Sequence, residues 1–566
     1  MLIIDPVEFR KGMIVNQFEL YPWPISDDEF KQYFGGVFDL YIDCATNESA
    51  EFSDLLMSDT RYILTLLNLI HINAAANLSI SNWGSVTPDI SIEALQEARR
   101  KDIDIGDINS DTFANAKRLG RAIFLAGKYT KLFSKSWSMK SIWLWADSLA
   151  LTIQSRYDGE RGITQKFRNT RDVGLGNPRE RLRRKFLKGK GINLVWIEDL
   201  VHFLSYRSIG HLELPNEVAF IVGEIFRNIS QMPGLYTANL DLKRFEDSWK
   251  ERLTILWNLY WAYRSGIWRK VETLHLVGSG NTTRKLLALA WQREGIKTFN
   301  YNHGGNLHLS PQQYYFLTNE ATWGNLVCPN RAIARNMKNT YSDVSLGRNF
   351  QKPNYLFPES EEEKKTPIPL SVPCDPEQNS ERVLLCGFAM HQKRFLDGDG
   401  LLFYFRLDLE LRIVLQLRDL GYEVTYKAHP EYSGITDGIF RDNGINVASG
   451  VWEEVWGDYH KLIFTDFSTT AFGFSLTTDK PIILTLRDGG GFPQDALSAL
   501  EKRVNHVPIT WSNHNRLNYD QEVLTDAVKA IDRKGENTEF WDKYVRYESD
   551  MFGQFEKEWP APGVPT

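Results

Sequence analysis

The stretch FTDFSTTAFGFSLTTDKPIIL, residues 464–484, places a dense group of hydroxyl side chains between two apolar runs. Residues 462–464, LIF, come before the group, and residues 482–484, IIL, come after it. Short apolar runs bounded by small polar residues are typical of buried parallel strands. The stretch therefore predicts two strands joined by a helix, with the hydroxyl groups at the point where the first strand ends.

Two interpretations of these hydroxyl groups stay open at the level of sequence. Ser, Thr and Asp side chains cap helices by accepting hydrogen bonds from free backbone N–H groups. A helix N-terminus also carries partial positive charge and binds anions, and neighbouring hydroxyl groups add donors. A single cap needs one hydroxyl group, whereas four lie within six residues here, so we also expect a phosphate site. The residues concerned are Thr465, Ser468, Thr469 and Thr470, with Asp466 among them.

Strand and helix patterns alternate on both sides of this stretch. Residues 382–388, RVLLCGF, and 422–430, YEVTYKAHP, read as strands, as do the apolar runs already quoted. Residues 400–421 have a helical period, and Gly421 fits a helix stop. This alternation predicts an α/β fold with a doubly wound parallel sheet. Ligands bind beyond the carboxyl ends of the strands in such sheets.

The first half of the chain also alternates between strand and helix patterns. Residues 1–5 and 37–45, VFDLYIDCA, are expected to be early strands, and residues from about 52 to 168 are mostly helical in pattern. Later strands are expected in three segments: 192–200 (INLVWIEDL), 273–280 (TLHLVGSG) and 297–302 (KTFNYN).

The domain boundaries follow from a change of composition. Residues 358–381 are rich in proline and charge and predict a linker. We therefore expect an N-terminal α/β domain over 1–357 with a helical insertion at about 52–168. The C-terminal α/β domain spans 382–566. It includes a helical segment at 539–559, for which contact with the first half of the chain is an open expectation.

Composition limits the classes of function. The 566 residues carry a formal net charge of -6, which disfavours nucleic acid as a partner. The four cysteines are scattered without metal-site spacing and indicate reduced thiols of a cytoplasmic protein. We expect neither a metal nor a cofactor, and no signal peptide or membrane span. The basic run at 179–190 predicts either contact with the inner face of the cytoplasmic membrane, binding of an anionic acceptor, or a solvated helix face.

Several polar residues stand at the predicted strand ends. Lys427 and His429 follow one strand of the second half, and Gly387 follows another, where the missing side chain would let the backbone approach a ligand. In the first half, the candidates at or near the acceptor are His303, Gly304, Gly305, Asn306, Ser279, Glu198 and Asp199. A turn, a helix cap or a solvated side chain is the alternative for each of them.

The KAHPE segment, residues 427–431, and the later TDFSTTAFGFSLTTDKPIILT, residues 465–485, resemble GT-B transferases of bacterial surface polysaccharide biosynthesis. Capsule Kdo transferases, bacterial sialyltransferases and teichoic-acid-type polyol-phosphate transferases carry similar short motifs. The resemblance covers mainly residues 382–486. It implies two Rossmann-like domains and a donor activated by a cytidine nucleotide.

The resemblance also implies roles for individual residues. His429, Lys427, Ser468, Thr469, Thr470 and Gly387 would bind the donor phosphates, which are stabilised without a metal. His303 would be a base, as the HG segment of teichoic-acid-type enzymes implies, and Glu198 and Asp199 match part of a catalytic segment of the Kdo transferases. Leu200 stands where those enzymes have glycine, which weakens that match.

The expected activity is transfer of a sugar, including a 3-deoxy-ulosonic acid, from a CMP- or CDP-linked donor to a capsule or O-antigen glycan, free or lipid-linked. A CDP-polyol phosphotransferase is the alternative within this class. A GT-B-fold nucleotide-sugar epimerase and a non-catalytic assembly scaffold are alternatives of another class.

Overall fold

A computed structural model gives the fold. It describes residues 2–3, 25, 27–64, 66–67, 70–71, 74, 86–87, 171–175, 187, 194–197, 212–232, 241–264, 270–277, 282–301, 316–328, 331–357, 382–388, 403–429, 433–450, 452–467, 469–487, 492, 494–512, 516–530 and 537–545. Most of the predicted insertion (52–168), the linker (358–381) and the basic run (179–190) therefore lie outside the described residues.

A six-stranded parallel sheet forms the centre of the N-terminal half. Its strands are β3 (Asp172–Leu175), β4 (Val195–Trp196), β5 (Thr273–Val277), β6 (Lys297–Tyr301), β7 (Asn325–Val327) and β8 (Asn354–Leu356). Their spatial order is β4-β3-β5-β6-β7-β8, and every pairing is parallel. Counted along the chain, this order is 2-1-3-4-5-6, so the direction of winding reverses between β3 and β5. An order that begins in this way is typical of flavodoxin-like sheets.

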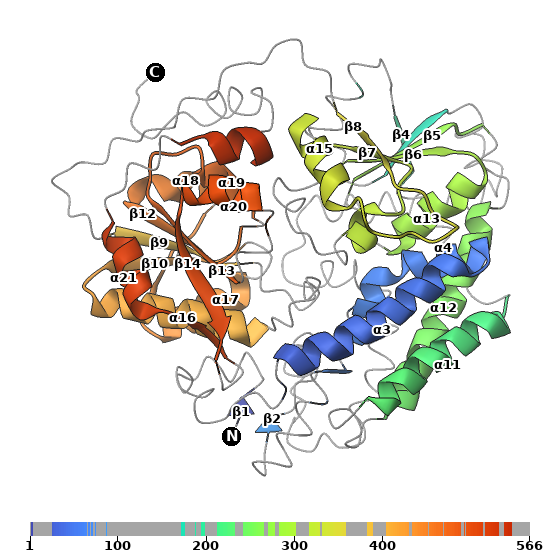
Figure 1. Cartoon of the computed structure of the whole chain (residues 1–566), viewed down its shortest axis with the longest axis horizontal. Coiled ribbons are helices and arrows are strands. Elements are labelled where there is room, and N and C mark those ends of the chain that lie inside the picture. The colour runs from blue at the N-terminus through green and yellow to red at the C-terminus, as the bar shows by residue number, and fades with distance from the viewer. Residues whose placement is uncertain are drawn as a thin grey trace, which may run out of the picture.

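Helices flank this sheet and form a layer beside it (Figure 1). The helices are α3 (Asp27–Asn47), α4 (Ala50–Ser58), α11 (Asn216–Gln231), α12 (Leu242–Arg264), α13 (Thr282–Arg293) and α15 (Arg331–Thr340), with a π-helical turn, η2 (Phe316–Glu320). α3 and α4 contact each other, α11 contacts α3, and α12 contacts α13. The sequence pattern placed the start of the helical segment at about residue 52. The helical layer begins earlier, with α3.

The predicted strand at residues 37–45 is wrong, because these residues belong to helix α3. Val37, Phe38, Tyr41 and Ala45 are fully buried, whereas Asp39 is exposed. Spacings of one, four and eight residues place side chains on one face of a helix. The β-branched and aromatic residues favoured a strand, but packing of this face against other helices decides the structure.

The predicted strand at residues 1–5 forms, although not in either large sheet. β1 (Leu2–Ile3) pairs in parallel with β2 (Val86–Thr87), which makes a separate two-stranded sheet.

Two buried aspartates, one within α4 and one at its C-terminal end, tie this helix to α12 and α13. Asp59 accepts hydrogen bonds from Arg252 Nε at 2.9 Å and from Trp249 Nε1 at 3.2 Å. Asp54 accepts from Arg293 Nε at 2.9 Å and from the Tyr260 hydroxyl at the same distance. Buried charges are tolerated when they are paired and hydrogen-bonded in this way.

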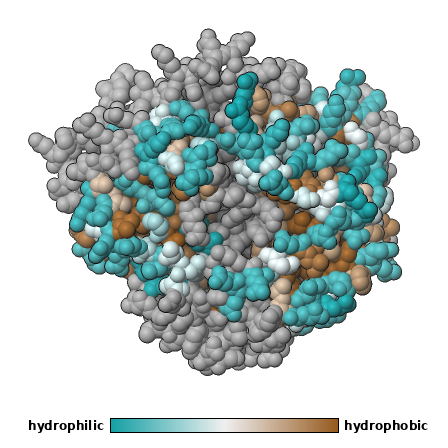
Figure 2. Space-filling model, in the orientation of Figure 1, coloured by the Kyte–Doolittle hydropathy of each residue, from teal (hydrophilic) through white to brown (hydrophobic). Residues whose placement is uncertain are grey.

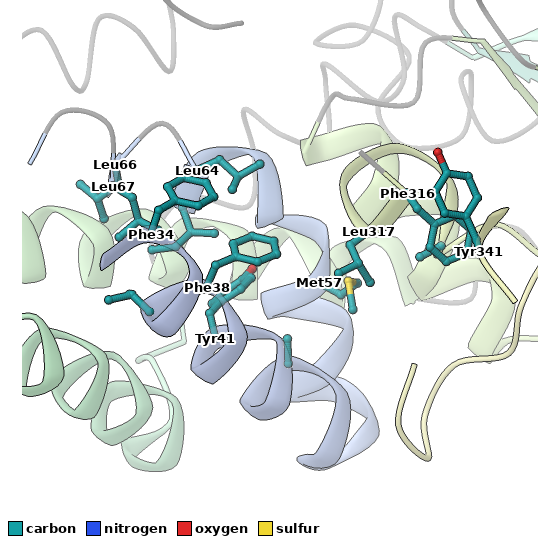
Figure 3. Close-up of a cluster of buried hydrophobic side chains, with 14 of the residues drawn as sticks. Phe34, Phe38, Tyr41, Met57, Leu64, Leu66, Leu67, Phe316, Leu317 and Tyr341 are labelled. Carbon is teal, nitrogen blue, oxygen red and sulfur yellow. The ribbon is translucent and has the colours of Figure 1, made fainter. Parts of the chain in front are cut away.

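Apolar side chains fill the space between these pairs. Figure 3 shows part of this core, with Phe34, Phe38 and Tyr41 of α3 on one side and Phe316, Leu317 and Tyr341 on the other. The core therefore joins the helical layer to the segments that follow β6.

A seven-stranded sheet forms the centre of the C-terminal half. Its strands are β9 (Arg382–Cys386), β10 (Glu423–Lys427), β11 (Asn446–Val447), β12 (Lys461–Phe464), β13 (Ile482–Arg487), β14 (Asn505–Trp511) and β15 (Leu517–Tyr519). The spatial order is β11-β10-β9-β12-β13-β14-β15, and only the β14–β15 pair is antiparallel. Counted along the chain, the first six strands have the order 3-2-1-4-5-6, which is the order of Rossmann sheets.

Helices cover both faces of this sheet, as the buried residues and Figure 1 show. α16 (Phe403–Asp419), α17 (Ser433–Asp442) and α21 (Gln521–Lys529) share a core with Leu385 and Ile463. α18 (Trp452–Val455), α19 (Thr470–Ser475) and α20 (Gln494–Glu501) share the opposite core with Leu384 and Leu462. Alternate residues of each strand therefore point to opposite, equally apolar layers, which explains why the strands read as continuous apolar runs.

The end of the described chain returns to the N-terminal half. The helical turn η7 (Trp541–Val545) contacts α15, and the Asn336 side-chain amide donates to the Lys543 carbonyl at 3.5 Å. Figure 1 shows these two elements meeting between the halves. Residues beyond 545 in the predicted helical segment lie outside the described residues.

The α/β class with mainly parallel sheets is confirmed. Among the described helices, none is both long enough and apolar enough to cross a bilayer. Figure 2 shows mostly hydrophilic residues on the described surface in this view, with smaller hydrophobic areas between them.

Candidate functional site

The C-terminal sheet reverses its direction of winding between β9 and β12. β10 and β11 lie on one side of β9, whereas β12, β13 and β14 continue on the other. Connections therefore leave β9 and β12 in opposite directions, the arrangement that gives doubly wound sheets a ligand-binding crevice at the carboxyl ends of the strands. Cys386 and Phe464 are the last residues of these two strands, and they are paired in register. We take this edge of the sheet as the candidate site.

Lys427 and His429 lie at this edge, as the sequence predicted. Lys427 is the last residue of β10 and is paired in register with Cys386. Its ammonium group is largely buried and donates to the Ala428 carbonyl at 3.1 Å. His429 is half-buried two residues further on.

Among the clustered hydroxyl groups of the opening stretch, the two that are described, those of Thr465 and Thr469, have different partners within the fold. Thr465 donates to Glu410 Oε1 at 2.5 Å. Thr469 is the N-cap of α19, and its hydroxyl accepts from Phe472 N at 3.1 Å. Ser468 lies outside the described residues, as does the side chain of Thr470. The capping interpretation therefore holds for Thr469.

Helix α19 contributes little to the predicted anion site through its dipole. It contains six residues, which is less than two turns. Any phosphate at this edge must therefore be held mainly by side chains and loop N–H groups.

The residue at the centre of this edge is Glu410 of α16, which the sequence analysis did not single out. Its Oε1 accepts from Phe388 N at 3.1 Å as well as from Thr465, and its Oε2 accepts from the Tyr426 hydroxyl at 2.9 Å. These donors come from the loop after β9, the end of β12 and β10. One carboxyl group thus joins three neighbouring strands at the reversal point.

The pKa of Glu410 is raised to about 7, chiefly because the side chain is fully buried. The hydrogen bonds from Thr465, Phe388 N and Tyr426, and the positive charge of Arg406, act in the opposite direction. Burial disfavours the charged form of a carboxyl group, whereas donors favour it. This carboxyl group therefore changes its charge close to neutral pH.

A buried ion pair lies beside Glu410. Arg406 donates through Nη2 to Asp466 Oδ2 at 2.9 Å and through Nη1 to the Thr465 carbonyl at 3.1 Å. Its guanidinium group also lies 4.2 Å from the centre of the Phe388 ring. Arg406 thus fixes both the end of β12 and the loop after β9.

A pattern in α16 could have identified these residues. Arg406, Asp408, Glu410 and Arg412 alternate with leucines and an isoleucine over residues 406–413. Residues four apart share a helix face, so this alternation puts charge on two different faces of one helix. Such a helix has no purely apolar face and must bury part of its charge. Asp408 accordingly accepts from Arg516 Nε at 2.9 Å on the other face.

The structure explains the glycine at position 387 by close packing, whereas the sequence suggested close approach of a ligand. A Cβ atom at this position would lie 2.1 Å from the Tyr426 hydroxyl oxygen and 2.6 Å from its Cζ. The missing side chain therefore makes room for the tyrosine that donates to Glu410. A role of Gly387 in donor binding stays a prediction.

Replacing Gly387 with alanine should destabilise the protein by about 1–3 kcal/mol, because overpacking forces neighbouring atoms to move. The closest neighbour is the Tyr426 hydroxyl, so the Tyr426–Glu410 hydrogen bond should break as well. Urea unfolding of G387A, Y426F and the double variant measures the effect. Because Y426F removes the closest atom, the double variant should lose less stability than the sum of the single changes. Strict additivity would contradict this account.

The candidates of the first half follow strand ends of the N-terminal sheet. β4 ends at Trp196, β5 at Val277 and β6 at Tyr301, and parallel strands end at the same edge. The predicted residues after these strands lie outside the described residues: Glu198, Asp199, Ser279, His303, Gly304, Gly305 and Asn306.

A buried hydrogen-bond chain runs across this sheet toward the end of β6. The Thr273 hydroxyl donates to Asp172 Oδ1 at 2.5 Å and lies 3.0 Å from His275 Nε2. His275 Nδ1 lies 2.8 Å from the Tyr301 hydroxyl. Because the Thr273 proton goes to Asp172, His275 donates through Nε2 and accepts from Tyr301 through Nδ1. Both ring nitrogens of the fully buried His275 therefore have hydrogen-bond partners.

Among the described residues, no group of histidine, cysteine and acidic side chains could hold a metal ion. No family model matches the chain, and a search of curated proteins found none that is similar to it.

Proposed function

We propose that the chain is a GT-B transferase that moves a sugar from a donor activated by a cytidine nucleotide to a surface glycan. The observation that carries the proposal is the strand order of the two sheets. Both are parallel sheets whose winding reverses, and each reversal point marks an edge where ligands bind in such folds. The candidate residues predicted from the sequence follow strands at these two edges.

The C-terminal edge supports the donor site of this proposal. A donor carries negative charge on its phosphates, and this charge grows as the nucleotide leaves. Lys427 and His429 supply cationic or protonatable groups there, while Thr465, Asp466 and Arg406 fix the end of β12. Ser468, Thr469 and Thr470 would add hydroxyl donors, and the order 3-2-1-4-5-6 is the one found in nucleotide-binding sheets.

The N-terminal edge would hold the acceptor glycan. In this proposal His303 removes a proton from the acceptor hydroxyl group, and Gly304 and Gly305 let the acceptor approach the backbone. Glu198 and Asp199, which follow β4 in the sequence, would act on the same acceptor. Within the proposal, the basic run at 179–190 contacts an anionic acceptor or the membrane surface that carries it.

CMP or CDP should bind more tightly than UDP or GDP. The paired glutamates that often hold the ribose of UDP- and GDP-linked donors are missing between residues 465 and 486. Calorimetric titration with the four nucleotides, and the shift in melting temperature that each one causes, measure the preference. Equal or tighter binding of UDP would contradict a cytidine donor, and binding of none of the four would remove the donor site altogether.

A further inference from the structure

We infer that Glu410 takes up one proton when an anionic phosphate group binds at the carboxyl ends of β9 and β12. The inference rests on the proposed nucleotide site and assigns a role within it to Glu410, which belongs to neither of the motifs that carry the transferase resemblance. Three features of the structure carry it: the position of the carboxyl group, its hydrogen-bond partners in both protonation states, and the charges around it.

The position of Glu410 couples it to any ligand in the crevice. Its Oε1 accepts from Phe388 N, in the loop that leaves β9, and from Thr465, in the loop that leaves β12. These two loops border the reversal point, where doubly wound sheets bind their ligands. A carboxylate in this position repels a phosphate, whereas the neutral acid does not.

The hydrogen bonds around Glu410 can be satisfied in both protonation states. In the ionised state, Tyr426 donates to Glu410 Oε2, and the Thr436 hydroxyl, which also bonds to Tyr426, donates to the tyrosine oxygen. When a proton from solvent binds Oε2, the acid donates to the tyrosine oxygen and Tyr426 donates to Thr436. Phe388 N and Thr465 keep Oε1 as their acceptor. Proton uptake therefore leaves Glu410 and Tyr426 paired and reverses the donor direction as far as Thr436.

The charges around Glu410 nearly balance. Arg406 on α16, Tyr426 on β10 and Cys386 on β9 interact with Glu410 directly. Lys427 on β10 acts on Cys386, Asp437 on α17 acts on Tyr426, and Asp466 after β12 pairs with Arg406. With Arg406 paired to Asp466, Lys427 is the main cation left to face a phosphate. Neutralising Glu410 removes one negative charge near this cation, while Asp437 continues to interact with it.

Burial already raises the pKa of Glu410 to about 7, so a further increase by a bound anion converts directly into proton uptake. Above pH 7 the free protein carries the charged form and must take up a proton to bind. Its affinity for the nucleotide should therefore fall by up to about tenfold per pH unit above pH 7. Below pH 7 the free protein already holds the proton, and this dependence disappears.

The variant Glu410→Gln tests the inference because glutamine resembles the neutral acid in shape and charge. CMP and CDP are titrated into wild type and E410Q at pH 6 and pH 8, in buffers with different ionisation enthalpies. At pH 8 the wild type should take up close to one proton more than E410Q and should bind up to about tenfold more weakly. At pH 6 the two should bind alike. All other titratable groups, including those of the nucleotide, are common to both proteins, so the difference between the proteins isolates Glu410.

A matched control and a second measurement make the result decisive. Glu454→Gln removes an exposed carboxylate from α18 and should behave like the wild type. When the pKa of a carboxyl group is higher in the folded state than in the unfolded state, the free energy of unfolding falls as the pH rises from the unfolded pKa toward the folded pKa, which is about 7 here. Unfolding stability of the wild type should therefore fall relative to E410Q over this range, with no ligand present.

Each other outcome overturns the inference in a recognisable way. Equal proton uptake by wild type and E410Q, with nucleotide bound to both, would overturn the role of Glu410 and leave the donor site standing. Binding of neither nucleotide to either protein would overturn the proposed function and the role together.

Discussion

Replacing Arg503 with alanine is expected to lower the free energy of unfolding by at least about 3 kcal/mol, because several buried carbonyl groups lose their donor. The Arg503 side chain is 1% exposed. Its guanidinium group donates to the carbonyls of Ser475, Leu476, Thr478 and Lys480 at 2.7–3.3 Å. These carbonyls run from the last residue of α19 to the residues before β13, so this one side chain holds the second part of the opening stretch.

Urea unfolding of R503A measures the loss, and Lys502→Ala is the matched control. Lys502 is exposed and pairs with Glu539 at 2.8 Å, an interaction worth at most about 1 kcal/mol at a protein surface. Arg503→Lys should recover only part of the stability, because a lysine ammonium group cannot reach all four carbonyls in the fixed geometry of a guanidinium group. Wild-type stability in R503A would show that these carbonyls have other partners.

His429→Ala and Ser468→Ala are each expected to weaken nucleotide binding by roughly 10- to 150-fold. A hydrogen bond to a charged group contributes about 1.5–3 kcal/mol, and each 1.4 kcal/mol is a factor of ten in affinity. In the proposed site both residues contact the same phosphates. The double variant should therefore lose less binding energy than the sum of the single changes.

Calorimetric titration of the single and double variants, with a melting curve for each, separates binding from folding. Thr477→Ala is the matched control from the same stretch, because its hydroxyl donates to the Phe474 carbonyl within the fold. This variant should lose some stability and keep its affinity for the nucleotide. Unchanged affinity in both H429A and S468A would remove the main support for a donor site at this edge.

Local sequence patterns are sufficient to predict most of the strands. The runs at 382–386, 423–427, 461–464 and 482–486 form strands where they were expected, and helix α16 ends before Gly421, whose φ is +92°. Each of these signals lies within a few residues of the element it specifies. A buried strand needs apolar residues on both faces, and a helix stop needs one residue that tolerates positive φ.

The same local reading fails at residues 37–45, where composition favours a strand and the chain forms a helix. Val37, Phe38, Tyr41 and Ala45 have no preference strong enough to decide between the two structures. Their burial against α11, at residues 216–231, and against Trp249 of α12 decides it.

The centre of the candidate site also depends on distant parts of the chain. The sequence marks Lys427, His429 and the hydroxyl groups of residues 465–470 because they follow strand patterns directly. It does not mark Glu410, whose partners lie 16, 22 and 55 residues away along the chain.

The sequence by itself thus determined the α/β class and the strand ends at which polar residues gather, because both depend on short-range periodicity. Only the tertiary structure decided which strands are neighbours, and hence where the winding reverses. It also decided that one carboxyl group is buried at that point, since burial and hydrogen-bond partners exist only once β9, β10, β12 and α16 have come together. The charge that Glu410 carries near neutral pH is therefore a property of the fold and not of the glutamate.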